Sequence, residues 1–355
     1  MPPLPNQPPF IPGDAPSTDT STEILRATTS VLANVISSRV SAAVGGPPGG
    51  GRARAQRPQY ATLGPYVTPG LEQTAQAAAP DGGGSFAAWL TGGWTRVEDS
   101  YVATAFKGDI WTPVAGADYT VDGRWVFGVT AGYEGSRIDT NYVHVPGRFK
   151  GDGFSIAPYV GLRLTDELLV TGGVGYVRTS YEQGRREAAR SLRGSFDGDR
   201  VFGFVNLAAT APVAWHGVDG LSLSASLGYR HVKEWQGSYT ETGTDGSADR
   251  KTSAEVELGQ IVVGPRIAYA ISDGMGGMVV EPFVSALFEY DAVSEASRPT
   301  PGSRSTGTDR TGFLIATGIN LQMDDGLSGS LEFNSMVGRE NFESYSLILG
   351  LRYRF

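Results

Sequence analysis

The sequence contains no cysteine, so thiol catalysis, cysteine-based metal sites and disulfides are excluded. It also has no run of about eighteen apolar residues, so no transmembrane helix is available. That absence does not exclude a membrane protein, because a membrane β-barrel needs only one apolar residue in two and escapes a hydropathy window. The mean hydropathy of −0.17 is compatible with such a pattern.

Positively charged residues are also outnumbered by negatively charged ones, with 29 Lys and Arg against 37 Asp and Glu. The formal net charge is −8 and the isoelectric point is about 5.0, whereas a protein that binds nucleic acid normally carries the opposite sign. The histidines are His144, His216 and His231; the first two fall in a loop or turn and the third faces outward near a strand end. No HExxH, GxSxG, P-loop or GxGxxG motif stands in a suitable context. We therefore expect no enzyme, no cofactor, no metal site and no nucleic-acid partner.

The N-terminal part divides into three segments. Residues 1–20 are rich in Pro, Ser, Thr and Asp and are predicted to be disordered. Residues 21–44 are predicted to form a helix, with Thr20 and Glu23 spaced as in a capping box. Residues 45–84 form a Gly/Pro/Ala-rich linker with a short second helix around Leu71–Ala79. The start lacks a basic region followed by an apolar one, so an exported protein would be a piece of a longer precursor or have a misassigned start.

From residue 85 to the end, apolar and polar residues alternate along long runs. The alternation is clearest in four runs; in one of them, Leu221, Leu223 and Leu227 alternate with serines. Alternation of this kind predicts strands with one apolar and one polar face. The predicted strands are Ser85–Glu98, Asp109–Thr120, Arg124–Arg137, Gly151–Thr165, Leu168–Gln183, Asp197–Val213, Leu221–Glu234, Ser253–Ile271, Met278–Asp291, Arg310–Met323, Leu327–Gly338 and Ser344–Phe355.

The connections between these runs alternate in length. Tight turns at 121–123, 166–167, 214–220, 272–277 and 324–326 alternate with long polar connections at 99–108, 138–150, 184–196, 235–252 and 292–309. Short turns at one end and long loops at the other are typical of outer-membrane barrels. The runs also exceed the roughly 9–11 residues that a strand needs to cross a bilayer.

The fold class predicted from these patterns is all-β, a transmembrane antiparallel β-barrel of about twelve strands over residues 85–355. Closure also gives the terminal run "SYSLILGLRYRF" a partner, because this last strand can pair with the first strand of the barrel. Pro113, Pro158, Pro265 and Pro282 fall within strands, where we expect bulges to absorb them. An aromatic girdle near the strand ends is expected from Trp89, Trp111, Trp125, Trp215, Tyr290, Tyr353 and Phe355.

The polar positions of the strands predict the lining of the lumen. A barrel between the filled eight-strand size and the open sixteen-strand size leaves a narrow wet lumen, with room for a helix or an extended hairpin. The predicted lining residues are Asp118, Arg124, Thr130, Glu134, Arg163, Arg230, Asn320, Glu332, Asn334, Arg352 and Arg354. Their mixed charges can hydrogen-bond a helix or a passing chain, or only solvate the lumen.

Several segments resemble one family, the β-domain of bacterial autotransporters of type V secretion. "GADY" at 116–119 with the following "DGRWVFGVTAGYEGS" is similar to that domain's second and third strands, and "APYVGLR" at 157–163 and "VEPFVSALFEY" at 280–290 to two later ones. The closing "LGLRYRF" resembles its terminal assembly signal, which implies that role for Phe355, Tyr353, Leu351, Leu349 and Leu347.

The resemblance implies an outer-membrane barrel with the N-terminal helix in or near its lumen, exporting or displaying an N-terminal passenger. The implied partners are the bilayer and lipopolysaccharide, the barrel assembly machinery, periplasmic chaperones and the chain's own passenger, with the barrel itself a monomer. Some relatives cleave themselves at an asparagine of the lumenal helix, for which Asn34 is the candidate here. The pattern departs from the family in its roughly 40-residue linker after the helix and in the absence of a foldable passenger in residues 1–20.

The alternatives are a stand-alone outer-membrane pore or structural barrel with a plugged lumen, a barrel enzyme and a soluble all-β protein.

Overall fold

The computed structural model describes residues 17–44, 84–101, 105–142, 144–187, 190–213, 220–271, 278–296, 310–323 and 326–355. The predicted linker with its short second helix, and most of the segment predicted to be disordered, lie outside this part of the chain. The described elements are α1 Ser17–Val44, β1 Ser85–Asp99, β2 Phe106–Val121, β3 Trp125–Tyr142, β4 Val145–Arg163, β5 Leu168–Glu187, β6 Arg190–Pro212, β7 Leu221–Gln236, β8 Tyr239–Gly243, β9 Ala248–Lys251, β10 Ala254–Tyr269, β11 Val279–Ala296, β12 Thr311–Gln322, β13 Leu327–Val337 and β14 Phe342–Arg354.

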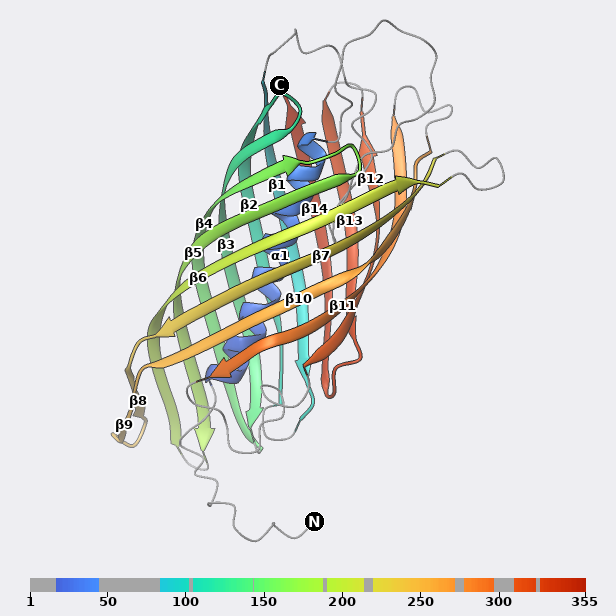
Figure 1. The fold of residues 1–355 in the computed structure, drawn as a ribbon. Coiled ribbons are helices and arrows are strands. Elements are labelled where there is room, and N and C mark those ends of the chain that lie inside the picture. Colours follow the sequence, from blue (N-terminus) through green and yellow to red (C-terminus); the bar gives the residue numbers. More distant parts are fainter. Residues whose placement is uncertain are drawn as a thin grey trace, which may run out of the picture.

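Twelve of these strands form one closed antiparallel barrel around α1 (Figure 1). Each pairs with its neighbours in sequence, except that β7 pairs with β10, because β8 and β9 form a hairpin beside the barrel. The barrel closes where β1 pairs with β14 over thirteen residue pairs, from Ala87↔Arg354 to Asp99↔Phe342. The predicted fold class, strand number and closure through the terminal run are confirmed.

The alternation in sequence corresponds to the two faces of the barrel wall. On β7, Ser222, Ser224 and Ser226 are buried, whereas Leu223 and Leu227 are exposed on the outer face. The same pattern places large apolar side chains around the outside of every barrel strand. An apolar exterior of this kind fits a hydrocarbon surrounding, whereas it would be an aggregation hazard in water.

Two of the predicted long loops are strand instead. Residues 138–150 continue β3 and β4 as a hairpin to Tyr142 and Val145, and residues 184–196 continue β5 and β6 to Glu187 and Arg190. Part of the 235–252 connection forms β8 and β9. These extensions carry polar side chains on their outer face, so they lack the apolar alternation by which strands were recognised.

The two ends of the barrel differ accordingly. We call the end with the β3–β4 and β5–β6 hairpin tips the extended rim. The other end, with tight turns at 122–124 and 164–167, is the short-turn rim, where β1 begins and β14 ends. In the first of these turns Asp122 and Gly123 have φ values of 52° and 61°, and the Arg124 amide donates to the Val121 carbonyl at 3.0 Å.

The strand prolines do not sit at bulges, so that expectation was wrong. The register of β2 with β3 is the same before and after Pro113, and that of β4 with β5 is the same before and after Pro158. The register shift that the structure has lies between Gly259 and Gln260 of β10. Each proline therefore stays paired with one neighbouring strand and lacks a partner only in the other, without an extra residue in its own strand.

The helix starts at Ser17, four residues before its predicted start, and ends at Val44 as predicted. Thr20 consequently lies inside the helix, and Glu23 pairs with Arg26 at 2.9 Å, so the predicted capping box is absent. Among the described residues, no helix combines the length and apolarity needed to cross a bilayer. Instead, α1 lies lengthwise inside the barrel (Figure 1).

Candidate functional site: a lumen filled by a helix

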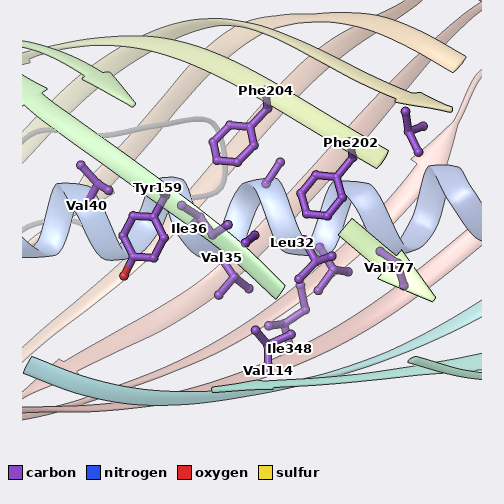
Figure 2. Close-up of a cluster of buried hydrophobic side chains, with 14 of the residues drawn as sticks. Leu32, Val35, Ile36, Val40, Val114, Tyr159, Val177, Phe202, Phe204 and Ile348 are labelled. Atoms are coloured by element: carbon purple, nitrogen blue, oxygen red, sulfur yellow. The ribbon is translucent and has the colours of Figure 1, made fainter. Parts of the chain in front are cut away.

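The middle of α1 packs against apolar side chains that point inward from the barrel wall. Figure 2 shows Leu32, Val35, Ile36 and Val40 of the helix among aromatic and aliphatic wall residues. All are nine-tenths or more buried, and they form one continuous cluster. The wall residues labelled there are Val114, Tyr159, Val177, Phe202, Phe204 and Ile348.

Glycines in the wall create room for the helix. A Cβ atom added to Gly161 of β4 would lie 1.9 Å from Cγ1 of Val40. One added to Gly350 of β14 would lie 2.5 Å from Nη2 of Arg39. Val40 is stiff at χ1 and cannot swing away cheaply, so the contact at Gly161 sets how closely the helix approaches β4.

An ionic cluster connects the N-terminal half of α1 to β11. Arg26 donates to both carboxylate oxygens of Asp291 at 2.8 and 2.9 Å and from Nε to Glu23 at 2.9 Å. Arg339, from the loop after β13, donates to the same Asp291 at 2.9 Å. These side chains are at most 5% exposed, so their charges depend on one another for stabilisation that water would otherwise provide.

A second cluster centres on Arg200 of β6, which is 1% exposed. Its guanidinium donates to Glu134 of β3 at 2.8 Å, to Glu234 of β7 at 2.7 Å and to the hydroxyl of Thr28 on α1 at 3.1 Å. Tyr181 donates to Glu234 at 2.9 Å. One wall arginine thus joins three strands to the helix.

The two ends of α1 lie toward opposite rims. Near its start, Gln236 at the end of β7 donates to Ser21 at 2.8 Å, and Thr20 hydrogen-bonds Tyr142 at the tip of β3. Near its end, Arg39 donates to Thr91 in the middle of β1 at 2.9 Å, and Val40 lies against Gly161, two residues before β4 ends at the short-turn rim. The helix therefore runs from the extended rim to the short-turn rim.

Trp89 departs from the predicted aromatic girdle. It is 4% exposed, faces the lumen, donates to Tyr159 at 3.2 Å and lies 5.4 Å beneath the Arg39 guanidinium. Trp215 lies outside the described residues. The remaining girdle residues are exposed on the outer face: Trp111, Trp125, Tyr290, Tyr353 and Phe355.

Most residues predicted to line the lumen are buried on the inner face. Those that the structure buries are Asp118, Thr130, Glu134, Arg163, Arg230, Asn320, Glu332, Asn334 and Arg352. Arg124 was assigned wrongly, because it is exposed in the turn between β2 and β3, and Arg354 is half-buried at the end of β14. Arg230 pairs with Glu289, and Arg352 lies 3.5 Å from Asp118.

The clusters that hold the helix include residues missed by sequence reasoning, namely Arg26, Arg200, Asp291 and Arg339. Arg200 does stand at an inward position of the β6 alternation, and that was the available signal. Arg26 sits on a helix, and Arg339 follows the end of a strand, so period-two alternation carries no information about either.

Asn34 lies on the buried part of α1 and is 8% exposed. It borders a cavity of about 20 Å³ shared with Asn206 and Arg230, enough for one water molecule. None of the described residues that line this cavity carries a carboxylate. Self-cleavage at Asn34 remains a prediction.

The residues predicted to form a terminal assembly signal lie on the outer face of β14 and just after it. Leu347, Leu349, Leu351 and Tyr353 are 45%, 58%, 51% and 44% exposed, and Phe355 is 72% exposed. The Phe355 amide donates to the Phe86 carbonyl at 2.9 Å, and their rings lie 5.7 Å apart. The terminal residue thus sits on the β1–β14 seam.

The described part of the chain holds no cluster of three or more His, Asp or Glu side chains placed to bind a metal ion. His231 is on the outer face, 3.1 Å from Glu257, and His144 is in the β3–β4 turn. His216 lies outside the described residues.

Comparison with known proteins agrees with this architecture. The autotransporter β-domain model matches residues 88–334. The chain belongs to the autotransporter β-domain family. Barrels of this family are outer-membrane transport domains rather than catalytic folds. A search of curated proteins finds no match.

Solved structures of the family share the fold. The translocator domain of NalP from Neisseria meningitidis aligns with a TM-score of 0.64 at 17% identity, covering 80% of this chain and 93% of that one. The β-domain of the Bordetella autotransporter BrkA aligns with a TM-score of 0.58 at 15% identity, covering 76% of this chain and 100% of that one. The transport unit of AIDA-I from Escherichia coli aligns with a TM-score of 0.54 at 14% identity, covering 79% of this chain and 92% of that one.

Proposed function

We propose that this chain is the translocator unit of an autotransporter, which inserts in the outer membrane and exports or displays its N-terminal segment at the cell surface. The observation that carries the proposal is the direction of α1. Its first turns bond to the extended rim, and its last turns lie toward the short-turn rim, where Val40 packs against Gly161 near the end of β4. A chain that enters at the short-turn rim would leave the N-terminus at the extended rim.

The lumen contacts support passage of a chain as well as its retention. Charged and apolar side chains alternate along the wall. One apolar cluster surrounds Ile24, the Arg200 cluster meets the helix at Thr28, and a second apolar cluster surrounds Leu32 and the residues after it. A narrow lumen of this kind has room for a helix or an extended segment and not for a folded domain. The passenger would therefore cross unfolded, while barrel assembly machinery and periplasmic chaperones deliver the barrel to the membrane.

Protease accessibility of the N-terminus tests the proposal. An export signal and an epitope tag are placed ahead of Met1, the fusion is expressed in a Gram-negative host, and protease is added to intact cells. We expect the tag to be removed while the barrel stays folded and shifts its gel mobility only on heating. A periplasmic protein carrying the same tag serves as the control and should be protected.

A protected tag in cells whose barrel is folded would contradict export. It would leave the alternative, a stand-alone outer-membrane barrel plugged by α1. Loss of the heat-dependent mobility shift in every membrane fraction would instead contradict insertion itself.

A further inference from the structure

A cavity of about 850 Å³ lies at the extended rim, between β4, β5, β6 and β8. Four cationic side chains border it from outward positions of the strands, against two carboxylates: Arg148, Lys150, Arg186 and Arg193 against Asp139 and Glu182. Arg185 also borders the cavity, but it is buried and pairs with Glu241 at 2.7 Å. We call this the cationic cavity, because it has a surplus of positive charge on a chain whose net charge is −8.

The strand register arranges three arginines of the cationic cavity around a glycine. Gly184 of β5 is paired with Arg148 of β4 on one side and with Arg193 of β6 on the other. Adjacent strands lie about 4.8 Å apart, so the two arginine stems stand about 10 Å from each other. Arg186 stands two residues further along β5, and a Cβ atom added to Gly184 would meet nothing closer than 3.6 Å. The floor between the arginines is therefore open backbone that a bulky anionic group can approach.

Two of these arginines have no partner in the described part of the chain. Arg148 donates from Nε to Asp139 at 3.1 Å. Arg186 and Arg193, by contrast, take part in no side-chain hydrogen bond or ion pair with the residues that the structure describes. Guanidinium groups hold oxyanions through paired N–H···O bonds. The cationic cavity thus offers two such groups to an anion.

Toward the short-turn rim, the cationic cavity ends at a zone of carboxylates that the barrel neutralises itself. Glu182 lies 3.7 Å from Lys150. Arg178 lies 3.3 Å from Asp197 and 3.1 Å from Asp199. The apolar outward residues of β5 and β6 begin only beyond this zone. A ligand seated against the apolar surface would have to cross these carboxylates to reach the arginines, so the cavity suits an anion that arrives from water.

The lining indicates which water-soluble anion fits. No aromatic side chain is among the described residues that line the cavity, so the stacking platforms on which nucleobases rest are missing. The strands β4, β5 and β6 around it are paired on both sides, so they offer no open edge to an extended peptide. The cavity has instead hydroxyl side chains that can bond sugar hydroxyls, namely Ser191, Ser195, Thr240 and Thr242. Hydroxyl groups beside unpaired arginines match a sugar chain that carries sulfate groups.

We infer that the cationic cavity binds a sulfated polysaccharide, with sulfate groups on Arg186 and Arg193 and sugar hydroxyls on the serine and threonine side chains. The inference rests on the proposed function in one respect, namely that the extended rim faces the outside of the cell. It gives the barrel itself a binding role at the surface, separate from export of the N-terminal segment.

Fluorescence anisotropy of labelled heparin with the purified full chain in detergent, at about 0.15 M salt, tests the inference. R186Q/R193Q should bind about tenfold more weakly than wild type, because it loses two charge-assisted contacts. G184E, which places a carboxylate between the flanking arginines, should weaken binding to a similar extent. R186K/R193K keeps both charges and should bind more tightly than R186Q/R193Q.

The matched control is R178Q, on the same strand and the same face. Arg178 is already paired with Asp197 and Asp199. It lies about 20 Å from Gly184 along β5, beyond the screening length of about 8 Å at this salt concentration. The affinity of R178Q for heparin should match that of wild type.

Equal heparin binding by wild type and R186Q/R193Q, with both barrels folded by heat-dependent gel mobility, would overturn the inference. Competition by double-stranded DNA as strong as by heparin would also overturn it, since the cavity would then attract any polyanion. Equal competition by desulfated heparin would do the same, since sulfate groups would not be recognised. Binding in detergent does not depend on export. A surface-exposed tag without heparin binding therefore contradicts the role of the cavity alone, and heparin binding with a protected tag contradicts export alone.

Discussion

Arg26 of α1 and Asp291 of β11 lie 265 residues apart in the chain and share two hydrogen bonds of 2.8 and 2.9 Å. Both side chains are at most 4% exposed. A two-pronged arginine–carboxylate pair fixes direction as well as distance, so it determines the depth and the rotation at which the helix rests in the lumen. The pair makes α1 a positioned plug rather than a loosely held segment.

Replacing Arg26 by alanine should loosen this plug. Removing one partner of a buried pair costs about 3–5 kcal/mol, which corresponds to a change of two orders of magnitude or more in an equilibrium. Asp291 would still be held by Arg339, so the barrel itself should keep its heat-dependent gel mobility. We expect R26A to raise the fraction of time at the higher conductance level in planar bilayers.

The control for R26A is R96Q, because Arg96 pairs with Asp109 at a half-exposed position and does not contact α1. The fraction of time that R96Q spends at the higher conductance level should match that of wild type. Identical recordings for R26A and wild type would mean that the ionic cluster does not hold the plug.

Gly161 provides a steric test of the same docking. G161A places a methyl group 1.9 Å from Cγ1 of Val40, which the stiff valine cannot accommodate. We expect faster cleavage of α1 by a small protease added to the purified barrel, and recovery when V40A is combined with G161A. G92A is the matched control, since a Cβ at Gly92 meets no atom within 4 Å. Failure of V40A to restore protection would contradict a direct clash.

Sequence alone predicted the barrel because burial on one face and apolar surroundings on the other impose a period of two on each strand. The serines of β7 show this plainly, with Ser222, Ser224 and Ser226 inward and Leu223 and Leu227 outward. The strand ends were less predictable. Beyond the apolar belt, outward positions of β4 and β5 carry polar residues such as Arg148 and Arg186. A polar run of this kind looks the same in a strand as in a loop, so both strands were predicted too short.

The sequence predicted which side chains line the lumen, but not which of them contact each other. Alternation identified Glu134 as inward, but it cannot tell which side chain across the lumen meets it, and Arg200 was overlooked. Trp89 was misplaced because an aromatic near a strand end is equally compatible with either face. Only the three-dimensional arrangement shows that the Arg39 guanidinium lies over its ring.

Deletion of residues 1–44 should open the lumen. Every barrel strand keeps both neighbours without α1, so the barrel should still form. It would lose the apolar contacts of Leu32, Ile36 and Val40 with the wall, and its unfolding temperature should fall. Single-channel conductance should rise above that of the full chain. An unchanged conductance would indicate that the lumen is closed by something other than α1.

A substitution at Phe355 separates the assembly of the barrel in cells from the stability of the folded barrel. The Phe355 ring is 72% exposed and contacts Phe86 across the seam, so F355A removes little buried surface and should refold in detergent almost as well as wild type. If the terminal pattern is read by the assembly machinery, F355A should nevertheless lower the heat-modifiable fraction in cells several-fold. L349R is the contrasting variant: an arginine on the lipid face costs about 2–4 kcal/mol near the bilayer midplane, so it should impair refolding into lipid vesicles as well. Equal losses for F355A in cells and in detergent would assign Phe355 to the stability of the seam instead of a signal.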